Sequence, residues 1–118
     1  MYKLAASEDL SFFLEIELLQ VCVGRNEIIL NFDNNIRLTI LSDFSVGKPD
    51  SITERFEDPI EGATALLQFL HVAVTKADAT PDGDLKLSFA SGGTLWAHDT
   101  SSQYESFLVM AGSKEIIV

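Results

Sequence analysis

The amino-acid sequence of 118 residues predicts an α+β fold in which two similar antiparallel β-meanders are linked by a central α-helix. Three observations favour it: apolar and polar residues alternate at period two in both halves, the same apolar positions recur at one offset, and the spacing becomes helical between the halves. We expect a single domain over 1–118, with meanders at about 17–47 and 71–118 and the helix at about 59–70.

The internal duplication rests on four pairs of apolar residues that share one sequence offset: Ile28/Leu85, Leu30/Leu87, Phe32/Phe89 and Leu38/Leu95. Polar turns at 33–35 and 91–93 separate the paired strands, and their Asn and Gly residues tolerate the positive φ of a tight hairpin. Two further strands are predicted at 106–111 and 115–118. The sequence leaves open whether the two meanders form one sheet or two.

The central helix has a start signal, with Asp58 as N-cap, Pro59 at the first position and Glu61 in the first turn. Its apolar stripe consists of Ile60, Ala63, Leu66, Leu67 and Leu70. A short N-terminal helix is predicted from Glu8 to Leu14, with Ser7 as its cap. Residues 43–57 have no regular period, which predicts a long loop with an irregular edge strand.

The charge is the unusual feature of the composition, because 18 Asp+Glu against 8 Lys+Arg gives −10 at pH 7. Such an excess argues against nucleic acid or an anionic membrane as a direct partner, since both bind through clustered Lys and Arg. A basic protein partner, a metal or simple solubility remains open.

The sequence also indicates the compartment. The lone cysteine, Cys22, forms no intramolecular disulfide, and the N-terminal residues lack the pattern of a secretory signal. The most apolar stretch, 63–74, is too short to span a bilayer. We therefore expect a cytoplasmic protein.

No motif supports an enzyme, a metal site or a cofactor. His98 precedes Asp99, Ser101 and Ser102, but no serine lies in a strained G-x-S-x-G elbow, so we interpret His98 as a solvated turn histidine. We interpret His71 as a structural residue of its strand and Cys22 as a buried small hydrophobe. The run 78–84 lacks the final Glu of a calcium loop and is interpreted as an acidic turn.

The densest acidic stretch, 43–61, carries a net charge of −4 with aromatic residues interleaved, which is typical of a surface that steers and then holds a basic partner. The alternative is a solvated loop anchored by its aromatics. The candidate partner-binding residues are those of this stretch and of a second acidic cluster in the following hairpin: Asp43, Asp50, Glu54, Phe56, Glu57, Asp82 and Asp84.

Several motifs resemble a family of small, uncharacterised bacterial proteins. They are Leu10-Ser11-Phe12-Phe13-Leu14, the strand pair at 19–24 and 28–32, and the Asp-Pro start of the helix. The later pattern Asp-Gly-x-Leu-x-Leu-x-Phe-x-x-Gly-x-x-Leu, at 82–95, and Tyr104-Glu105-Ser106-Phe107 extend the resemblance over nearly the whole chain. Tryptophan is commoner in this family at the position of Phe107.

Some proteins of this type look like immunity proteins of contact-dependent growth inhibition systems, including those paired with ribonuclease A-like toxins. The resemblance implies a protein that neutralises a cognate basic nuclease toxin by occluding its active site, and it transfers no catalytic residue. The alternative is a non-enzymatic α+β module that binds a small ligand, in an apolar pocket between the halves, or self-associates. The sequence does not indicate an oligomeric state.

Overall fold

The computed structural model describes residues 3–101 and 103–118, which form two five-stranded antiparallel sheets and one α-helix. In the first sheet the strand order is β1 (Leu18–Val23), β2 (Ile28–Phe32), β3 (Ile36–Ile40), β9 (Phe107–Ala111) and β10 (Lys114–Ile117). In the second sheet the order is β5 (Ser51–Phe56), β4 (Phe44–Lys48), β8 (Thr94–Ala97), β7 (Leu85–Phe89) and β6 (Val74–Ala79). The predicted α+β class is therefore confirmed, and the two meanders lie in separate sheets.

The predicted duplication is visible in the structure as two equivalent three-stranded meanders, β1–β2–β3 and β6–β7–β8. Each first hairpin contains one register shift, between Leu18 and Gln20 in β1 and between Val74 and Lys76 in β6. The turns after β2 and β7 use positive φ at the expected residue types, with Asn34 at 63° and Gly92 at 93°.

Each sheet is completed by a hairpin from the other half of the chain. The hairpin β4–β5 follows the first meander in sequence but pairs with β8 of the second, and β9–β10 follows the second meander but pairs with β3 of the first. The long loop predicted at 43–57 was therefore wrong, but the irregular edge strand expected within this segment corresponds to β5. The prediction failed because β5 lies at a sheet edge, where Ser51–Arg55 are all exposed and show no alternation.

The two crossings from one sheet to the other lie side by side. The backbone N–H of Leu41 donates to the Ser106 carbonyl at 2.9 Å, and that of His98 donates to the Asp43 carbonyl at 3.0 Å. These two bonds join equivalent positions of the two repeats. The hydroxyl groups of Ser42 and Thr100 also form a hydrogen bond between the crossings. The two halves are thus tied together where the chain changes sheet.

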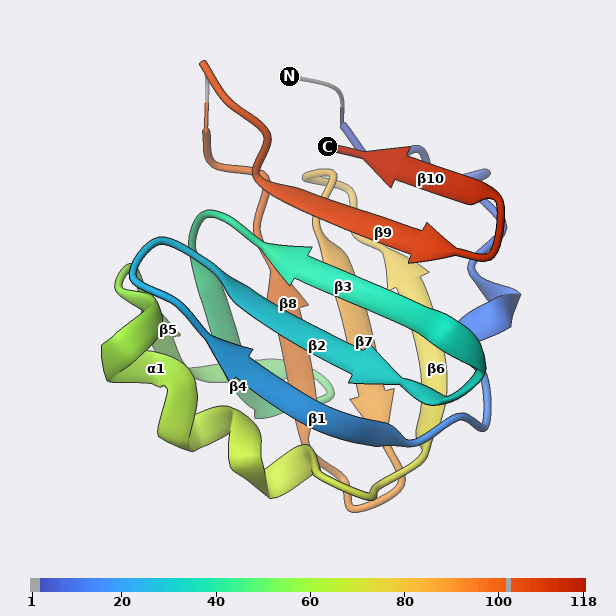
Figure 1. Cartoon of the computed structure of the whole chain (residues 1–118), viewed down its shortest axis with the longest axis horizontal. Coiled ribbons are helices and arrows are strands. Elements are labelled where there is room, and N and C mark those ends of the chain that lie inside the picture. The colour runs from blue at the N-terminus through green and yellow to red at the C-terminus, as the bar shows by residue number, and fades with distance from the viewer. Residues whose placement is uncertain (1–2, 102) are drawn as a thin grey trace.

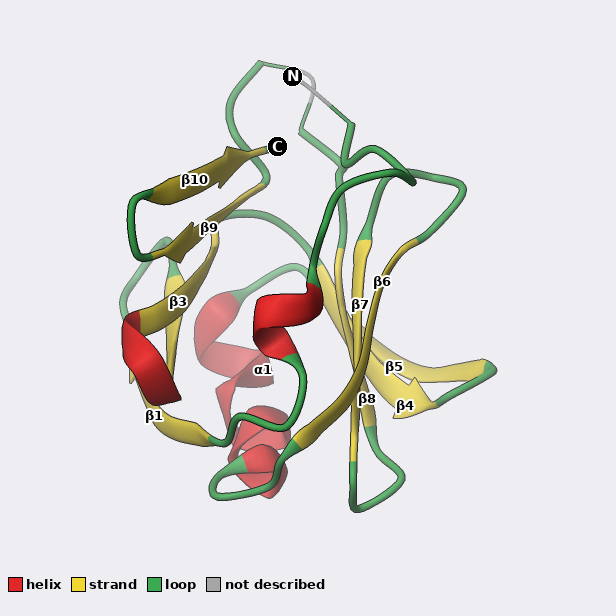
Figure 2. Ribbon diagram, turned by 90° about the vertical axis from the view of Figure 1, so that its right-hand side faces the viewer, coloured by secondary structure: helices red, strands yellow, loops and turns green. Residues whose placement is uncertain are grey.

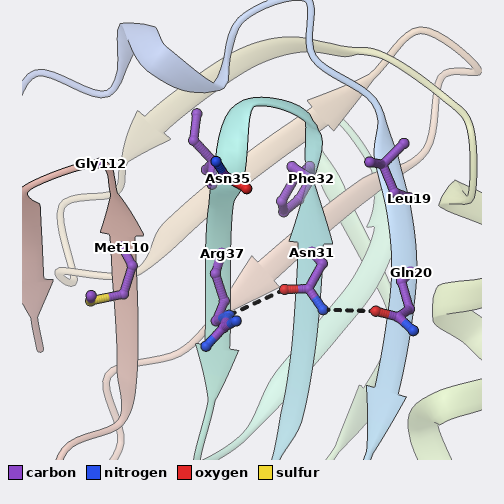
Figure 3. A pocket seen from close by; sticks show the side chains of 9 residues that line it. Leu19, Gln20, Asn31, Phe32, Asn35, Arg37, Met110 and Gly112 are labelled. Atoms are coloured by element: carbon purple, nitrogen blue, oxygen red, sulfur yellow. Dashed lines mark hydrogen bonds between the residues drawn. The ribbon is translucent and has the colours of Figure 1, made fainter.

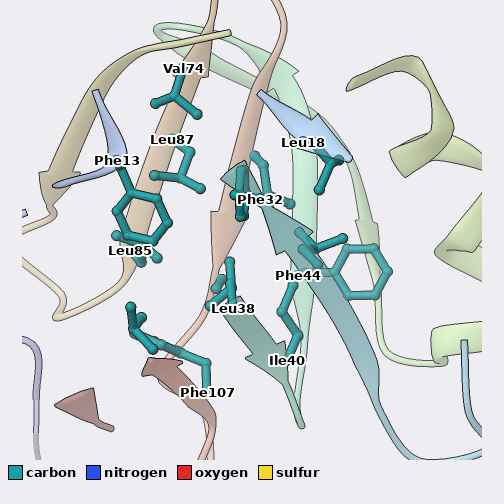
Figure 4. Close-up of a cluster of buried hydrophobic side chains, with 14 of the residues drawn as sticks. Phe13, Leu18, Phe32, Leu38, Ile40, Phe44, Val74, Leu85, Leu87 and Phe107 are labelled. Carbon is teal, nitrogen blue, oxygen red and sulfur yellow. The ribbon is translucent and has the colours of Figure 1, made fainter. Parts of the chain in front are cut away.

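The hydrophobic core fills the space between the two sheets, whose strands cross one another in projection (Figure 1). Strands such as β2 and β7 contribute the side chains of alternate residues, and most of the core side chains are almost fully buried (Figure 4). The largest side chains with less than 2% exposure include Phe13, Phe44, Phe69, Phe107, Leu30, Leu38 and Leu87.

The helix α1 (Pro59–Leu66) continues as a 3-10 turn, η3 (Leu67–Phe69), and packs beside β1 and β5 (Figure 1). Asp58 caps it as predicted, because its Oδ1 accepts a hydrogen bond from the backbone N–H of Ile60 at 2.9 Å. The predicted apolar stripe is only partly correct, since Ile60 is 62% exposed and Leu67 50%. The helix instead buries Gly62, Leu66 and the adjacent Phe69.

The predicted N-terminal helix is only a 3-10 turn, η1 (Ser11–Phe13), which lies on the side of the core opposite α1 (Figure 2). Its backbone N–H at Ser11 bonds to Asp9 Oδ1 at 3.0 Å, so Asp9 and not Ser7 provides the side-chain acceptor. The backbone turns away at Glu15, where φ is 67°. Burial of Phe13 fixes this turn in place without the need for a longer helix.

The first residues of the second repeat also differ from expectation. His71 precedes β6, has a φ of 62° and is exposed, so it is a turn residue and not part of a strand. The turn predicted at 33–35 is the short 3-10 turn η2 (Asp33–Asn35), which connects β2 and β3. Within the described residues, no helix is long and apolar enough to cross a membrane.

Gly62 is the tightest point of the helix packing. A Cβ atom at this position would clash with the ring of Phe44 and lie 2.6 Å from Cγ of Phe56. These two rings are tilted against each other, with their centroids 5.4 Å apart. We expect Gly62→Ala to lower the free energy of unfolding by about 1–3 kcal/mol despite alanine's higher helix propensity. Urea unfolding measures this, with the exposed helix substitution Thr64→Ala as the control; equal or greater stability for Gly62→Ala would contradict the packing described.

Candidate functional site

Five carboxylates surround the edge strand β5 and the start of α1, and we call this set the β5 surface. Its members are all exposed: Asp50, Glu54, Glu57, Asp58 and Glu61. Among the described residues, no cationic group lies within 4.0 Å of any of their carboxylate oxygens. Three of the predicted partner-binding residues, Asp50, Glu54 and Glu57, belong to this surface, and its negative charge is not neutralised locally.

The other predicted residues of the 43–61 stretch have partners within the fold. Asp43 Oδ2 accepts a hydrogen bond from the guanidinium of Arg55 at 3.1 Å, and these residues form an ion pair. Phe56 is half-buried and packs against Phe44 at the edge of the core. The structure thus places Phe56 under the β5 surface and not on it.

The two members of the second acidic cluster differ in exposure. Asp82 is exposed in the turn between β6 and β7. Asp84, two residues later, points to the outer face of the second sheet, where its Oδ2 lies 2.8 Å from Nδ1 of His98. The side chain of Asp84 is only 13% exposed, so it offers little surface to a partner.

His98 is the centre of a buried hydrogen-bond network. Its Nε2 lies 2.7 Å from Oγ of Ser45 on β4, and its residue exposure is 4%. When the imidazole is neutral and carries its proton on Nδ1, Nδ1 donates a hydrogen bond to Asp84, and Nε2 accepts one from the Ser45 hydroxyl. The prediction of a solvated turn histidine was wrong, because the crossing at Asp43 brings β4 alongside β8, a pairing that the local sequence does not reveal.

The network continues toward β9. The backbone N–H of Asp99 donates to Asp84 Oδ1 at 2.8 Å, and the hydroxyl of Ser106 donates to Asp99 Oδ1 at 3.3 Å. Ser101 donates its backbone N–H to Ser106 at 3.0 Å. Ser102, the other serine considered after His98, lies outside the described residues. Asp99 and Ser101 therefore stabilise the crossing from β8 to β9.

Asp84 has a pKa below its ordinary value of 3.8. Partial burial raises the pKa of Asp84, but the hydrogen bonds from His98 and from the Asp99 backbone, together with the electrostatic effects of His98 and Arg55, lower it by a larger amount. A carboxylate held in this way is stabilised in its charged form. The network therefore contributes to stability when Asp84 is ionised.

The order Ser45–His98–Asp84 has the connectivity of a serine hydrolase triad, but Ser45 has no access to a substrate. Ser45, the second residue of β4, is 0% exposed. A nucleophile requires an open face toward the scissile bond and oxyanion donors beside it. The arrangement as it stands joins β4 to the residue before β7 and the residue after β8.

The first repeat provides a comparison for this network. By the offset of the repeat, Glu27 corresponds to Asp84 and Leu41 corresponds to His98. Leu108 corresponds to Ser45, because Leu108 pairs with Thr39 as Ser45 pairs with Trp96. The same strand pairing therefore forms with leucines where the second repeat has histidine and serine. The polar network is a property of one repeat and not a requirement of the fold.

A depression of about 720 Å³ lies on the outer face of the first sheet, not between the halves where the alternative function required a pocket. A row of polar side chains crosses it, with Asn31 donating to Gln20 Oε1 at 3.1 Å and Arg37 Nε donating to Asn31 Oδ1 at 3.1 Å (Figure 3). Sequence analysis missed these residues, although their polar phase in β1–β3 was a signal. Cys22, half-buried and 3.7 Å from Asn31 Nδ2, is less enclosed than predicted.

Within residues 3–101 and 103–118, no three His, Cys, Asp or Glu side chains are arranged to hold a metal ion. The acidic turn at 78–84 instead closes on itself, since the backbone N–H of Asp84 donates to the Thr80 hydroxyl at 3.0 Å.

The lowered pKa of Asp84 predicts a pH-dependent contribution to stability. Because the folded pKa lies below the unfolded value, the contribution is complete above about pH 4 and is lost as the pH falls through the folded pKa. We expect Asp84→Asn to cost about 1–2 kcal/mol of unfolding free energy at pH 6–7 and progressively less below pH 4. Urea unfolding at several pH values measures this, and the exposed Asp82→Asn is the matched control. A cost that does not depend on pH would contradict the assignment.

The burial of Ser45 predicts the outcome of chemical labelling. A fluorophosphonate probe, which reacts with activated serines, should leave the folded protein unlabelled while it labels a known serine hydrolase in the same reaction. Mass spectrometry measures the adduct. Modification of Ser45 in the wild type, absent in His98→Ala, would show that the triad is active.

Comparison with known protein families gives one match, which covers residues 14–118, nearly the whole chain. Comparisons with curated proteins and with solved structures give no significant match. The matching group is described as a family of unknown function, DUF6188. The expectation of an uncharacterised family is thereby confirmed, and the chain belongs to DUF6188.

Proposed function

We propose that the chain is an immunity-type inhibitor that binds a cognate basic nuclease toxin and blocks its active site through the β5 surface. The observation that carries the proposal is the set of five exposed carboxylates around one sheet edge, none of them paired with a cation among the described residues. Such an inhibitor acts in the cytoplasm of the cell that makes it and needs no cofactor or catalytic residue.

Charge supports this proposal first. A nuclease binds RNA phosphates with Lys, Arg and His side chains, and carboxylates on a rigid surface offer those side chains a similar set of acceptors. The net charge of −10 speeds the encounter with a basic protein and disfavours nucleic acid itself.

The edge strand adds contacts that charge alone does not provide. In the part of the chain that the structure describes, no strand pairs with the outer edge of β5, so backbone groups on this side are available to a partner. Two apolar side chains, Ile52 at 46% and Ile60 at 62% exposure, lie in the same segment as the acids. Burial of apolar side chains beside steering charges is typical of a tight interface.

The second candidate function is a module that binds a small ligand or self-associates. The depression on the first sheet favours it, because Arg37, Asn31 and Gln20 offer convergent polar groups beside Leu19 and Met110. This face lies away from the β5 surface, so the two functions are separable by mutation.

Charge reversal at the β5 surface tests the proposal. The triple variant Asp50→Lys, Glu54→Lys and Glu57→Lys changes the net charge from −10 to −4 and should abolish rescue of cells that express the toxin encoded directly upstream. In purified form we expect the affinity to fall at least 100-fold, because like charges then face the basic site. Wild-type association should also slow steeply as the salt concentration rises.

The matched control reverses three exposed acids elsewhere, Glu17→Lys, Asp78→Lys and Glu105→Lys, with the same change in net charge. It should retain rescue and lose much less affinity. Equal loss in both triple variants would show that only bulk charge matters, and full rescue by the β5 variant would reject this surface.

A further inference from the structure

The outer faces of the two sheets differ in chemistry although the two repeats share one fold. Across the second sheet, one outward row of paired residues reads Arg55, Ser45, Trp96, Lys86 and Asp78. The equivalent row of the first sheet reads Ile117, Leu108, Thr39, Ile29 and Cys22. The second repeat shows that outward positions in this fold accept charged residues, so the apolar row of the first sheet requires another explanation.

In this row Ile117 is exposed, Cys22, Ile29 and Leu108 are half-buried, and Thr39 is buried. The row belongs to a wider surface, which we call the β9 face. The exposed apolar side chains of this face are Met110 at 39%, Ile117 at 42%, Leu41 at 36% and Leu19 at 45% exposure. In the second sheet, by contrast, Trp96 is only 7% exposed, with the ammonium group of Lys86 5.5 Å from its ring centroid. Apolar side chains gathered on one open sheet face are typical of an interaction surface.

The neighbouring row of the β9 face carries its charges symmetrically. It runs Gln20, Asn31, Arg37, Met110 and Glu115, one residue from each strand of the sheet. Arg37 and Glu115 are therefore one strand away from Met110 on opposite sides. The Arg37 guanidinium bonds through Nε to Asn31, and no described carboxylate lies within 4.0 Å of it.

We propose that the β9 face binds a second copy of this chain, in a two-fold symmetric dimer whose axis runs along β9. Rotation about that axis places Met110 opposite Met110 and Leu108 opposite Leu108 of the second copy. It also brings Arg37 of each copy opposite Glu115 of the other, so the one cation and the one anion of the row pair twice. Thr39 then faces Ile117 of the second copy.

Charge selects this occupant over others. A basic partner would meet Arg37 near the centre of the face, whereas an acidic partner would meet Glu115. A second copy satisfies both charges at once, and the apolar side chains of the β9 face supply the buried contact. The dimer leaves the β5 surface free, so it does not depend on the proposed inhibitor function.

Analytical ultracentrifugation between about 0.01 and 1 mM protein tests the dimer, at about 0.15 M salt, where repulsion between the net charges is screened. We expect the mass to rise with concentration from 13.0 kDa toward twice that value. Arg37→Glu or Glu115→Arg alone should weaken dimerisation at least tenfold, and the double variant Arg37→Glu/Glu115→Arg should restore it to within about threefold.

The controls separate this surface from others. Arg25→Glu and Glu105→Arg make the same charge changes at exposed positions outside the β9 face and should leave the dimer unchanged. The β5 triple-lysine variant should also dimerise. A wild type that stays monomeric at 1 mM, or a dimer that neither Arg37→Glu nor Glu115→Arg weakens, would overturn the proposal. The proposal would also be overturned if the wild type stayed monomeric and bound inorganic phosphate through Arg37.

Discussion

The exchange of hairpins between the two repeats is the constraint on which the rest of the structure depends. Neither meander alone makes a five-stranded sheet, because β9–β10 must leave the second repeat to pair with β3, and β4–β5 must leave the first to pair with β8. The pairing covers one edge of each meander and lets the ten strands enclose one core. It also couples the halves, since removing either hairpin would expose a strand edge and an apolar face together.

The crossing point explains why the polar network around His98 lies where it does. Strand β4 reaches the second sheet through Asp43, whose carbonyl accepts a hydrogen bond from the backbone N–H of His98. This bond sets the register that places Ser45 beside the His98 ring. Asp84 then completes the network from β7. Buried polar groups are stable only when each finds a partner, so these three residues favour one register of the second sheet. The first repeat reaches the same pairing with Leu41 and Leu108.

Divergence between the repeats also distributes interaction chemistry over the molecule. Inward positions have kept apolar residues in both halves, as in Leu30 and Leu87, because both faces contribute to the same core. Outward positions are free of that requirement and differ between the surfaces. The β9 face combines apolar side chains with one cation and one anion, the β5 surface is acidic, and the outer face of the second sheet is polar. A single duplicated fold thereby carries several distinct surfaces.

The sequence by itself determined the α+β class, the duplication, the turns at 33–35 and 91–93 and the Asp58 cap, because each depends on periodicity or on local backbone preference. It also located three members of the β5 surface, Asp50, Glu54 and Glu57. Only the tertiary structure decided that β4 and β9 change sheets, that Asp84 and His98 are enclosed, and that Arg37 and Glu115 share one row. Those outcomes depend on pairing between strands far apart in the chain. The residues beside a given position in the sequence do not indicate which residues it will contact across a sheet.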